Sequence, residues 1–319
     1  MKIVVLDGYA ANPNDISWDA MASLGELTVY DRTPVEEIAG RIGNAEAVFT
    51  NKAPITRETM EHCPNLKFIS VLATGFNIVD TAAAKEKGIV VCNVPAYSTT
   101  SVTQHVFAML LAACNHISEH SASVKQGDWQ NCKDFVYWNY PLVEIAGKTL
   151  GIVGMGQIGQ SVAKAAKAFG MKVLAYSRTA KPELEDESLK FVSLEELLAQ
   201  SDVISLHCPL TPDTQGIICE KTLKQMKDGV ILINTSRGPT IVEQDLYNAL
   251  ESGKVAYAAV DVLAKEPPRE GSLLIDHPNC FVTPHIAWAP FEARVRLMNI
   301  SVENLKAFQK GQPQNVVNK

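Results

Sequence analysis

The chain has 319 residues, 46% of them hydrophobic and 20% charged, which excludes a disordered or fibrous protein and is enough for two domains. Its 29 Lys and Arg residues against 35 Asp and Glu residues give a net charge of -6, without the clustered positive charge that nucleic acids or anionic membranes attract. No apolar run approaches the roughly 20 residues of a membrane-spanning helix, and the start MKIVVLDG is expected to be a strand and not a signal peptide.

The cysteines indicate a reducing compartment. There are seven of them, an odd number, and no two are spaced as C-x-x-C: Cys63, Cys92, Cys114, Cys132, Cys208, Cys219 and Cys280. This distribution is typical of free thiols in a cytoplasmic protein and not of a disulfide framework or a zinc site. His116 and His120 are one helical turn apart, but no further Cys or His stands near them, so we expect a solvated helix face and no bound metal.

The first third of the chain alternates strands with helices. The strands are expected in KIVVLD, ELTVYD, AVFTN, LKFISVLA and GIVVCN, with helices over residues 16–24, 35–41 and 80–87. Apolar strands separated by helices are typical of a parallel sheet that is covered on both faces. This part of the chain therefore predicts an α/β domain.

From residue 98 onward, apolar residues recur at helical spacing over about 25 positions, which predicts one long helix between two domains. An aromatic loop, DWQNCKDFVYWNYP, follows it. Strands then resume in TLGIVG, KVLAYS, KFV, DVISLHCP, GVILINTS, VAYAAVDVL and CFVTP, and a last helix begins after Pro290. The spacing does not decide whether this last helix packs on the first domain. The pattern predicts an α/β protein with two doubly wound parallel-sheet domains.

A glycine-rich turn joins the strand at 149–153 to the helix that follows it, and the next strand ends at Tyr176. In this turn Gly154 permits the tight bend, Gly156 allows a pyrophosphate to approach the backbone, and Gly159 allows close packing of helix and strand. The helix N-terminus then offers free N–H groups to the phosphates. A plain turn between a strand and a helix does not require three glycines at this spacing, so the sequence predicts a dinucleotide-binding site.

The end of the second strand indicates which nucleotide is preferred. An NAD site usually has an acidic residue there for the ribose hydroxyls, whereas this chain has Ser177 and Arg178, with Lys181 close behind and no acid until Glu183. A guanidinium can pair with a 2′-phosphate. We therefore expect NADP(H) to be favoured over NAD(H), the alternative being that Arg178 stacks on the adenine of NAD.

Three polar residues follow strands of the second domain: Arg237, Glu266 and His285. Carboxyl ends of parallel strands border the cofactor crevice, so the three side chains are expected to converge. A guanidinium binds a carboxylate or polarises a carbonyl, an imidazole transfers a proton, and a carboxylate orients the imidazole and stabilises its charged form. Each residue alone is as well explained as an ordinary turn or loop residue, but their joint placement favours a shared catalytic role beside the dinucleotide turn.

The chain resembles the D-isomer-specific 2-hydroxyacid dehydrogenase family over nearly its full length. The resemblance is carried by LKFISVLATGFNIVD, GIVVCNVPAYSTTSV, TLGIVGMGQIG, DVISLHCPLTPDT, LINTSRGPTIVEQDLYNAL, AAVDVLAKEP and FVTPHIAWAP. The blocks TNKAPIT, VLATGFNIVD, YWNYPLVEIAGKTLGIVG and HIAW look most like the glycerate dehydrogenase, or hydroxypyruvate reductase, branch. The resemblance implies an NAD(P)-dependent oxidoreductase that reduces hydroxypyruvate or glyoxylate to the D-2-hydroxy acid.

The resemblance also implies roles for individual residues. Catalysis falls to Arg237, Glu266 and His285; the substrate is bound by Leu72, Ala73, Thr74, Gly75, Arg237 and Trp288; the cofactor is bound by Gly154, Gly156, Gln157, Ile158, Gly159, Ser177, Arg178, Pro209, Thr214, Thr235 and Asp261. Backbone N–H groups at 74–75 would hold the substrate carboxylate, Arg237 would hold the carbonyl oxygen, and protonated His285 would give that oxygen its proton.

The same resemblance implies a split architecture. Residues 1–99 and 287–319 would form the substrate domain, with the C-terminal helix packed on the N-terminal part, and residues 100–286 would form the dinucleotide-binding domain. A homodimer is expected to form through the latter, with the aromatic loop at 134–140 in the dimer arm. One departure is Thr103-Gln104, where the family often has Glu.

Several alternatives stay open at this point. Asn51 and Lys52 are expected either to contact the far end of the substrate or, for Lys52, to be a solvated loop residue. A nucleotide-sensing scaffold of the same fold and a dehydrogenase for a bulkier 2-hydroxy acid are the main competing functions. A formate or phosphite dehydrogenase is disfavoured, because formate-type sites pair the histidine with Gln where this chain has Glu266.

Overall fold

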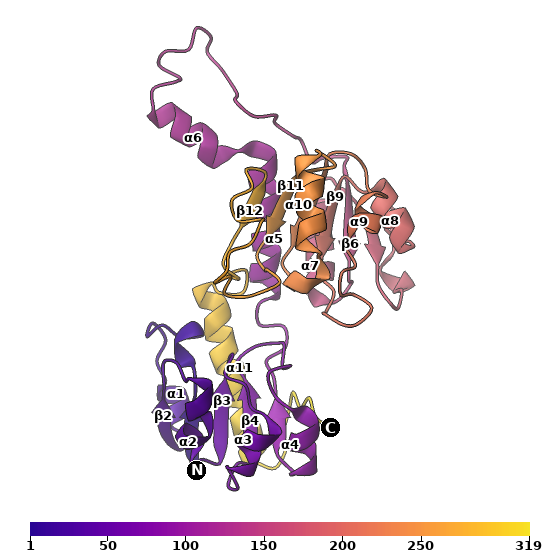
Figure 1. The fold of residues 1–319 in the computed structure, drawn as a ribbon. Coiled ribbons are helices and arrows are strands. Elements are labelled where there is room, and N and C mark those ends of the chain that lie inside the picture. The colour runs from indigo at the N-terminus through magenta and orange to yellow at the C-terminus, as the bar shows by residue number, and fades with distance from the viewer. The chain divides into compact units, whose positions relative to one another are not determined.

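The computed structural model describes residues 1–319, which form two compact units (Figure 1). Unit 1 contains Met1–Ser98 and Ala289–Lys319, so both ends of the chain build it. Unit 2 contains Thr99–Trp288. None of the helices is both long and apolar enough to pass through a membrane.

A five-stranded parallel sheet forms the centre of unit 1. Its spatial order is β2 (Glu26–Val29), β1 (Lys2–Val5), β3 (Ala47–Thr50), β4 (Phe68–Val71) and β5 (Val90–Cys92). The helices are α1 (Asp19–Ala22), α2 (Ile38–Ile42), α3 (Arg57–Glu61), α4 (Thr81–Glu86) and α11 (Phe291–Gln309), with 3-10 turns η1 (Gly8–Ala10) and η2 (Val35–Glu37). All five strands expected in this part of the chain are present.

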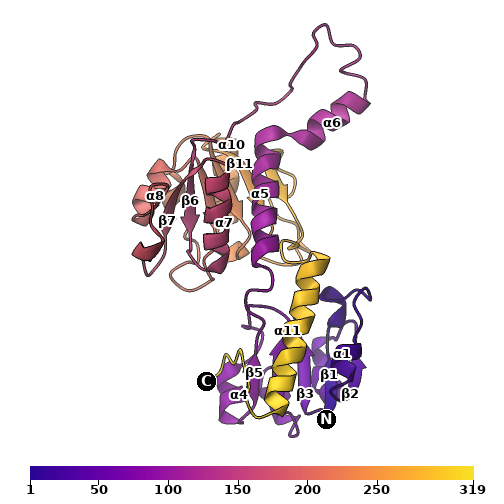
Figure 2. The ribbon, with the colours of Figure 1, turned by 180° about the vertical axis from the view of Figure 1, so that it is seen from behind.

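The C-terminal helix α11 belongs to unit 1 and runs along its sheet (Figure 2). The ring of Phe308 from this helix lies 4.9 Å from that of Phe68 in β4, and Phe68 is fully buried. Helices α2, α3 and α4 supply the opposite hydrophobic layer. Of the helix expected over 16–24, only the single turn α1 is formed. It begins later than predicted because the Asn12 side chain bonds the backbone of Asp15 and Ile16 and fixes a turn there.

Unit 2 is built on a seven-stranded parallel sheet. Its spatial order is β12 (Cys280–Val282), β11 (Val255–Val260), β10 (Val230–Asn234), β9 (Val203–Leu206), β6 (Thr149–Val153), β7 (Lys172–Tyr176) and β8 (Leu189–Phe191). The helices are α5 (Thr99–Asn115), α6 (Ile117–Lys125), α7 (Gln157–Ala168), α8 (Leu194–Gln200), α9 (Glu220–Leu223) and α10 (Glu243–Glu251), with 3-10 turns η3 (Pro182–Leu184) and η4 (Gly238–Thr240).

Helices cover both faces of this sheet. Helices α5 and α7 lie side by side on one face, and α8, α9 and α10 cover the other (Figures 1 and 2). In the central strands β6, β9 and β10, residues of both orientations are therefore buried, which is why these strands read as continuous apolar runs in the sequence. The predicted fold class, two doubly wound parallel-sheet α/β domains, is confirmed.

The prediction of a single long helix after residue 98 is wrong. The structure has two helices, α5 and α6, separated by His116, which has a left-handed backbone with φ of 47°. Histidine is among the residues that enter this region more readily than most. The apolar spacing continues across the break, so the pattern of hydrophobic residues did not reveal it.

Candidate active site

The glycine turn lies where the strand order of unit 2 reverses, between β6 and β9. Gly154 has a φ of 106°, and a Cβ atom there would lie 2.6 Å from the backbone of His207, which follows β9. A Cβ atom on Gly159 would lie 2.1 Å from the Gly154 carbonyl oxygen. At Gly156, by contrast, a Cβ atom would meet nothing within 4 Å. Two of the glycines are required by packing, and the third borders open space, as a ligand-binding turn requires.

Helix α7 offers unused donors at this turn. Gly156 is its N-cap and has no side chain to satisfy the first N–H groups. The first backbone N–H bonded within the helix is that of Gln160, at 3.0 Å from the Gly156 oxygen. The N–H groups of Gln157 and Ile158 precede it and are available to an anion, with the positive end of the helix dipole behind them.

The end of strand β7 adjoins the glycine turn and is rich in cations. The Gly154 N–H donates to the Tyr176 oxygen at 2.7 Å, and Ser177 uses its hydroxyl to bond the Thr179 carbonyl at 2.6 Å. Arg178 is exposed. The ammonium of Lys181 donates to the backbone oxygen of Met155, inside the glycine turn, at 3.0 Å. The sequence placed Lys181 only as a nearby cation; its contact with the turn requires a fold of the intervening loop that spacing does not give.

The other residues expected to bind the cofactor lie after β9 and β10. The Thr214 hydroxyl donates to the Pro209 carbonyl at 2.6 Å and so holds its own loop together. The hydroxyl oxygen of Thr235 is buried and has no hydrogen-bond partner. A buried polar atom without a partner requires an explanation, and a polar ligand supplies one. The open glycine turn, the free helix N-terminus and this hydroxyl all fit a bound dinucleotide.

His207 occupies the reversal point as a neutral side chain. Burial lowers the pKa of this histidine to about 4, and its Nε2 atom lies 2.8 Å from the Ser205 hydroxyl. The backbone of His207 packs on Gly154, so this residue borders the glycine turn.

His285 and Glu266 form a hydrogen-bonded pair in unit 2. The Nδ1 atom of His285 lies 2.7 Å from Oε2 of Glu266, and the other carboxylate oxygen accepts the Leu263 N–H at 3.0 Å. A carboxylate only accepts, so Nδ1 carries the proton of this bond. The side chains are 29% and 32% exposed, which leaves Nε2 of the imidazole accessible to a substrate. This is the arrangement of a general acid that is oriented by a carboxylate.

The backbone around His285 is held in a strained turn. Its φ is 54°, and its N–H lies 2.8 Å from the Asp261 carbonyl oxygen and 2.9 Å from that of Thr283. The carboxylate of Asp261, which is 1% exposed, accepts the N–H groups of Ile286 and Ala287 at 2.8 and 2.9 Å. Asp261, expected to line the cofactor, thus also fixes the turn that presents the imidazole.

Arg237 is placed by a rigid turn beside the loop of Glu266. Its carbonyl oxygen accepts hydrogen bonds from Asn234 and Thr240 at 2.9 and 2.6 Å, while its guanidinium is exposed. A Cβ atom on the next residue, Gly238, would lie 1.9 Å from the Leu263 oxygen, so the two backbones are in direct contact. Since the Leu263 N–H also binds Glu266, the backbones that carry Arg237, Glu266 and His285 adjoin one another in unit 2.

The loop expected to bind the substrate carboxylate follows β4 in unit 1. The Leu72 oxygen accepts a hydrogen bond from Asn51 at 2.7 Å, and the Thr74 oxygen accepts one from Asn93 at 2.7 Å. The Thr74 hydroxyl donates to the Val94 carbonyl at 2.9 Å. The backbone N–H groups of Ala73, Thr74 and Gly75 are absent from these bonds and donate to no other group of the unit. The loop is thus fixed through its oxygens, the N–H of Leu72 and the Thr74 hydroxyl, while the backbone N–H groups of Ala73, Thr74 and Gly75 are unused.

The neighbouring loop at 51–53 is anchored by Asp7. Its carboxylate accepts the backbone N–H of Asn51 at 2.7 Å and that of Ala53 at 2.9 Å. The Asn51 side chain is committed to Leu72, so its observed role is structural. The Lys52 side chain is exposed, and Trp288 is partly buried at the end of unit 2.

His116 and His120 do not form a solvated face, as the sequence suggested. His116 is buried and its ring stacks on that of Tyr140 at 4.6 Å and lies 5.1 Å from that of Tyr257. His120 bonds the His116 carbonyl at 2.8 Å. No cluster of three potential metal ligands is found in the structure. Packing of two aromatic rings from distant parts of the chain explains the burial.

Comparison with known proteins gives the same assignment as the geometry. Residues 107–287 match the family model described as D-isomer specific 2-hydroxyacid dehydrogenase, NAD binding domain. A hydroxypyruvate reductase of Blautia hydrogenotrophica is 54% identical over the full length of both chains, and a glycerate dehydrogenase of Methylorubrum extorquens is 46% identical over 92% of each. A crystal structure of a Thermus thermophilus protein shares 36% identity with a TM-score of 0.86, covering 99% of this chain and 100% of its own. The chain belongs to the D-isomer specific 2-hydroxyacid dehydrogenase family, and it is an NAD(P)-linked oxidoreductase that acts on a CH–OH group.

Proposed function

We propose that the protein reduces hydroxypyruvate or glyoxylate to the corresponding 2-hydroxy acid. The observation that carries the proposal is the 2.7 Å bond between His285 and Glu266 on a unit with a dinucleotide turn. The functions named for the Blautia and Methylorubrum relatives support a small 2-oxo acid of this kind.

The chain's own residues serve the transfer of a proton and the stabilisation of charge. A reduced nicotinamide nucleotide supplies the hydride that the carbonyl carbon receives. His285 donates its Nε2 proton to the carbonyl oxygen, and Glu266 orients the ring and stabilises its charged form. Arg237 stabilises the negative charge that develops on that oxygen. One hydride and one proton convert the C=O group to CH–OH, which balances the reaction.

We assign binding of the substrate carboxylate to the backbone N–H groups of Ala73, Thr74 and Gly75, in the loop that begins at Leu72; the N–H of Leu72 itself donates to the Thr50 carbonyl oxygen at 2.8 Å. The unused donors of this loop and its fixed oxygens support the assignment. Residues 1–99 with 287–319 are accordingly the proposed substrate domain, with Trp288 as a substrate-contacting residue, and residues 100–286 the proposed dinucleotide-binding domain.

NADP(H) is the proposed preferred cofactor. Ser177 provides no carboxylate to accept from the ribose hydroxyls of NAD, and Arg178 is exposed beside the glycine turn. The Lys181 ammonium on the Met155 carbonyl adds a second positive charge at this turn. Two cations and no acid favour a nucleotide that carries an additional phosphate.

A homodimer is the proposed assembly, formed by the arm that includes α6 and the following loop. This segment exposes large apolar side chains: Ile117, Trp129, Phe135, Trp138 and Leu142 are between 54% and 89% exposed. Such a concentration is typical of a protein interface. Sedimentation velocity should give a dimer for the wild type and a monomer for Phe135→Asp combined with Trp138→Asp.

We further assign the protein to the cytoplasm, since all seven cysteines are unpaired, as expected where thiols stay reduced. Cell fractionation checks this.

The activity test is a substrate panel with purified protein. Oxidation of NADPH and NADH is followed with hydroxypyruvate, glyoxylate, pyruvate, phenylpyruvate and 2-oxoisocaproate. The proposal expects the highest kcat/KM with hydroxypyruvate or glyoxylate and with NADPH. A preference for a bulky 2-oxo acid would contradict the assigned substrate. Nucleotide binding without turnover of any acid would instead indicate a sensing scaffold.

A further inference from the structure

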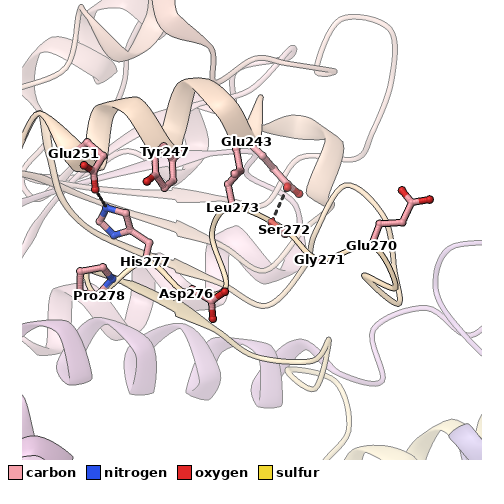
Figure 3. Close-up of a pocket in the computed structure, with 10 residues that line it drawn as sticks. All are labelled: Glu243, Tyr247, Glu251, Glu270, Gly271, Ser272, Leu273, Asp276, His277 and Pro278. Carbon is pink, nitrogen blue, oxygen red and sulfur yellow. Dashed lines mark hydrogen bonds and ion pairs between the residues drawn. The ribbon is translucent and has the colours of Figure 1, made fainter.

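One face of helix α10 holds the long loop that joins β11 to β12. Glu243, Tyr247 and Glu251 are successive helical turns apart and point toward this loop (Figure 3). Together with loop residues they line a cavity of about 670 Å³ behind the loop. The same loop carries Glu266, so this helix face lies on the structural path to the catalytic pair.

Glu243 makes two bonds to the loop, one with each carboxylate oxygen. Oε1 accepts the backbone N–H of Ala264 at 2.7 Å. Oε2 accepts the hydroxyl of Ser272 at 2.7 Å, the bond drawn in Figure 3. These two partners stand on either side of Glu266 in the sequence. A single side chain therefore fixes both ends of the segment that presents the carboxylate to His285.

The second attachment lies two helical turns further along α10. Nε2 of His277 lies 3.1 Å from Glu251, its Nδ1 accepts the Asn279 N–H at 3.1 Å, and the ring meets the edge of Tyr247 at 5.5 Å. His277 is 7% exposed and both of its ring nitrogens have partners. This contact fixes the end of the loop that leads into β12, while Glu243 fixes the part around Glu266.

Few other interactions hold the segment between Ala264 and Ser272, the two residues that Glu243 binds. It forms neither helix nor strand, and Lys265 and Glu270 pair with each other at 3.0 Å while about 80% exposed. Exposed ion pairs of this kind contribute little. Just before this segment, the backbone of Leu263 packs directly against Gly238, which follows Arg237. Helix α10 begins just after that turn, so Glu243 connects the position of Arg237 to that of Glu266.

We propose that Glu243 is a positioning residue for the dehydrogenase reaction, acting through its bonds to Ala264 and Ser272 to hold Glu266 against His285. The inference rests on the proposed roles of Glu266 and His285. Glu243 is not among the groups proposed to contact the reacting atoms. The bonds, and not the negative charge of Glu243, carry the effect.

Three substitutions and one matched control separate these possibilities. Glu243→Ala removes both bonds. Glu243→Gln keeps both, because its oxygen accepts the Ala264 N–H and its amide donates to the Ser272 hydroxyl, which reverses its role. Ser272→Ala removes one bond only. Glu270→Gln is the control, since it removes a negative charge from the same cavity without breaking a bond to α10.

The expected result is a selective loss of turnover. Glu243→Ala should lower kcat about tenfold to a hundredfold, the scale of a displacement of a catalytic group by about 1 Å, with KM for NADPH within about twofold. The kcat of Ser272→Ala should lie between that of Glu243→Ala and that of the wild type. If Glu243→Ala fails to fold, a kcat of Ser272→Ala below the wild-type value still tests the proposal. Glu243→Gln and Glu270→Gln should keep kcat within about twofold of the wild type.

A spectroscopic measurement gives a readout that does not depend on turnover. The Nδ1 proton of His285 should appear as a downfield resonance in the proton NMR spectrum and be absent in His285→Asn. It should move or broaden in Glu243→Ala and stay unchanged in Glu243→Gln.

Two results would overturn the proposal: an unchanged resonance and kcat in Glu243→Ala, or an equal loss in Glu243→Gln and Glu243→Ala. If the wild type reduces no 2-oxo acid, the proposed function fails, and the resonance still decides the positioning role.

Discussion

Nδ1 of His285 lies 2.7 Å from Oε2 of Glu266, although 19 positions separate the two residues. The bond orients the imidazole and leaves its Nε2 atom for the substrate. Because proton transfer by a positioned side chain contributes about a hundredfold or more, His285→Ala should lower kcat for reduction by at least that factor. Glu266→Gln should lower it about tenfold to a hundredfold, since an amide does not stabilise the charged imidazole.

Steady-state kinetics of the two variants with hydroxypyruvate checks this, with Glu270→Gln as the control from the same loop. KM for the nucleotide should stay near the wild-type value in all three. Near-normal turnover of His285→Ala would refute the assigned acid.

The choice of nucleotide is predicted to depend on the residues after β7. Ser177→Asp introduces a carboxylate that repels a 2′-phosphate and accepts from the ribose hydroxyls of NAD. The ratio of kcat/KM for NADPH to that for NADH should fall about a hundredfold, because NADPH binding is weakened and NADH gains a charge-assisted hydrogen bond. Ser177→Ala removes the hydroxyl without adding charge and is the matched control. An unchanged ratio in Ser177→Asp would mean that this position does not read the phosphate.

Two glycines of the same turn should behave in opposite ways. Gly159→Ala places a Cβ atom 2.1 Å from the Gly154 oxygen, so it should lower Tm or prevent folding. Gly156→Ala meets nothing within 4 Å and should fold normally, but its methyl group occupies the space that a pyrophosphate needs. Thermal unfolding and NADPH titration measure both effects. If Gly156→Ala binds NADPH as tightly as the wild type, the phosphates do not lie at this turn.

The features that the sequence predicted are those that local chemistry determines. The central strands, such as β3, β4, β9 and β10, are apolar because both sheet faces are covered there, so they stand out in the sequence. The glycine turn is visible because three backbone requirements recur at fixed spacing. By contrast, the left-handed His116 interrupts a pattern that still reads as helical.

Hydrogen bonds between residues that are far apart in the chain could not be predicted from the sequence either. The Asp261 carboxylate holds the His285 turn through backbone N–H groups some 25 positions away, and Glu243 reaches Ala264 across 21. Nε2 of His105, from α5, lies 3.1 Å from the hydroxyl of Thr283 in the same network. No local pattern encodes such contacts, because they depend on how the loops of unit 2 fold.

His207 is predicted to make the fold sensitive to acid. Burial lowers the pKa of its side chain to about 4, against 6.5 for an exposed histidine. Below about pH 6.5 the unfolded chain binds a proton that the folded chain does not, so stability falls as the pH is lowered and levels off below about pH 4. Between about pH 7 and about pH 5 this group alone should reduce the free energy of unfolding by about 2 kcal/mol. His207→Gln, which can still bond Ser205 but does not titrate, should lose about that much less over the same interval in urea unfolding at matched protein concentration. Equal losses in the wild type and the variant would show that folding does not lower the pKa of His207.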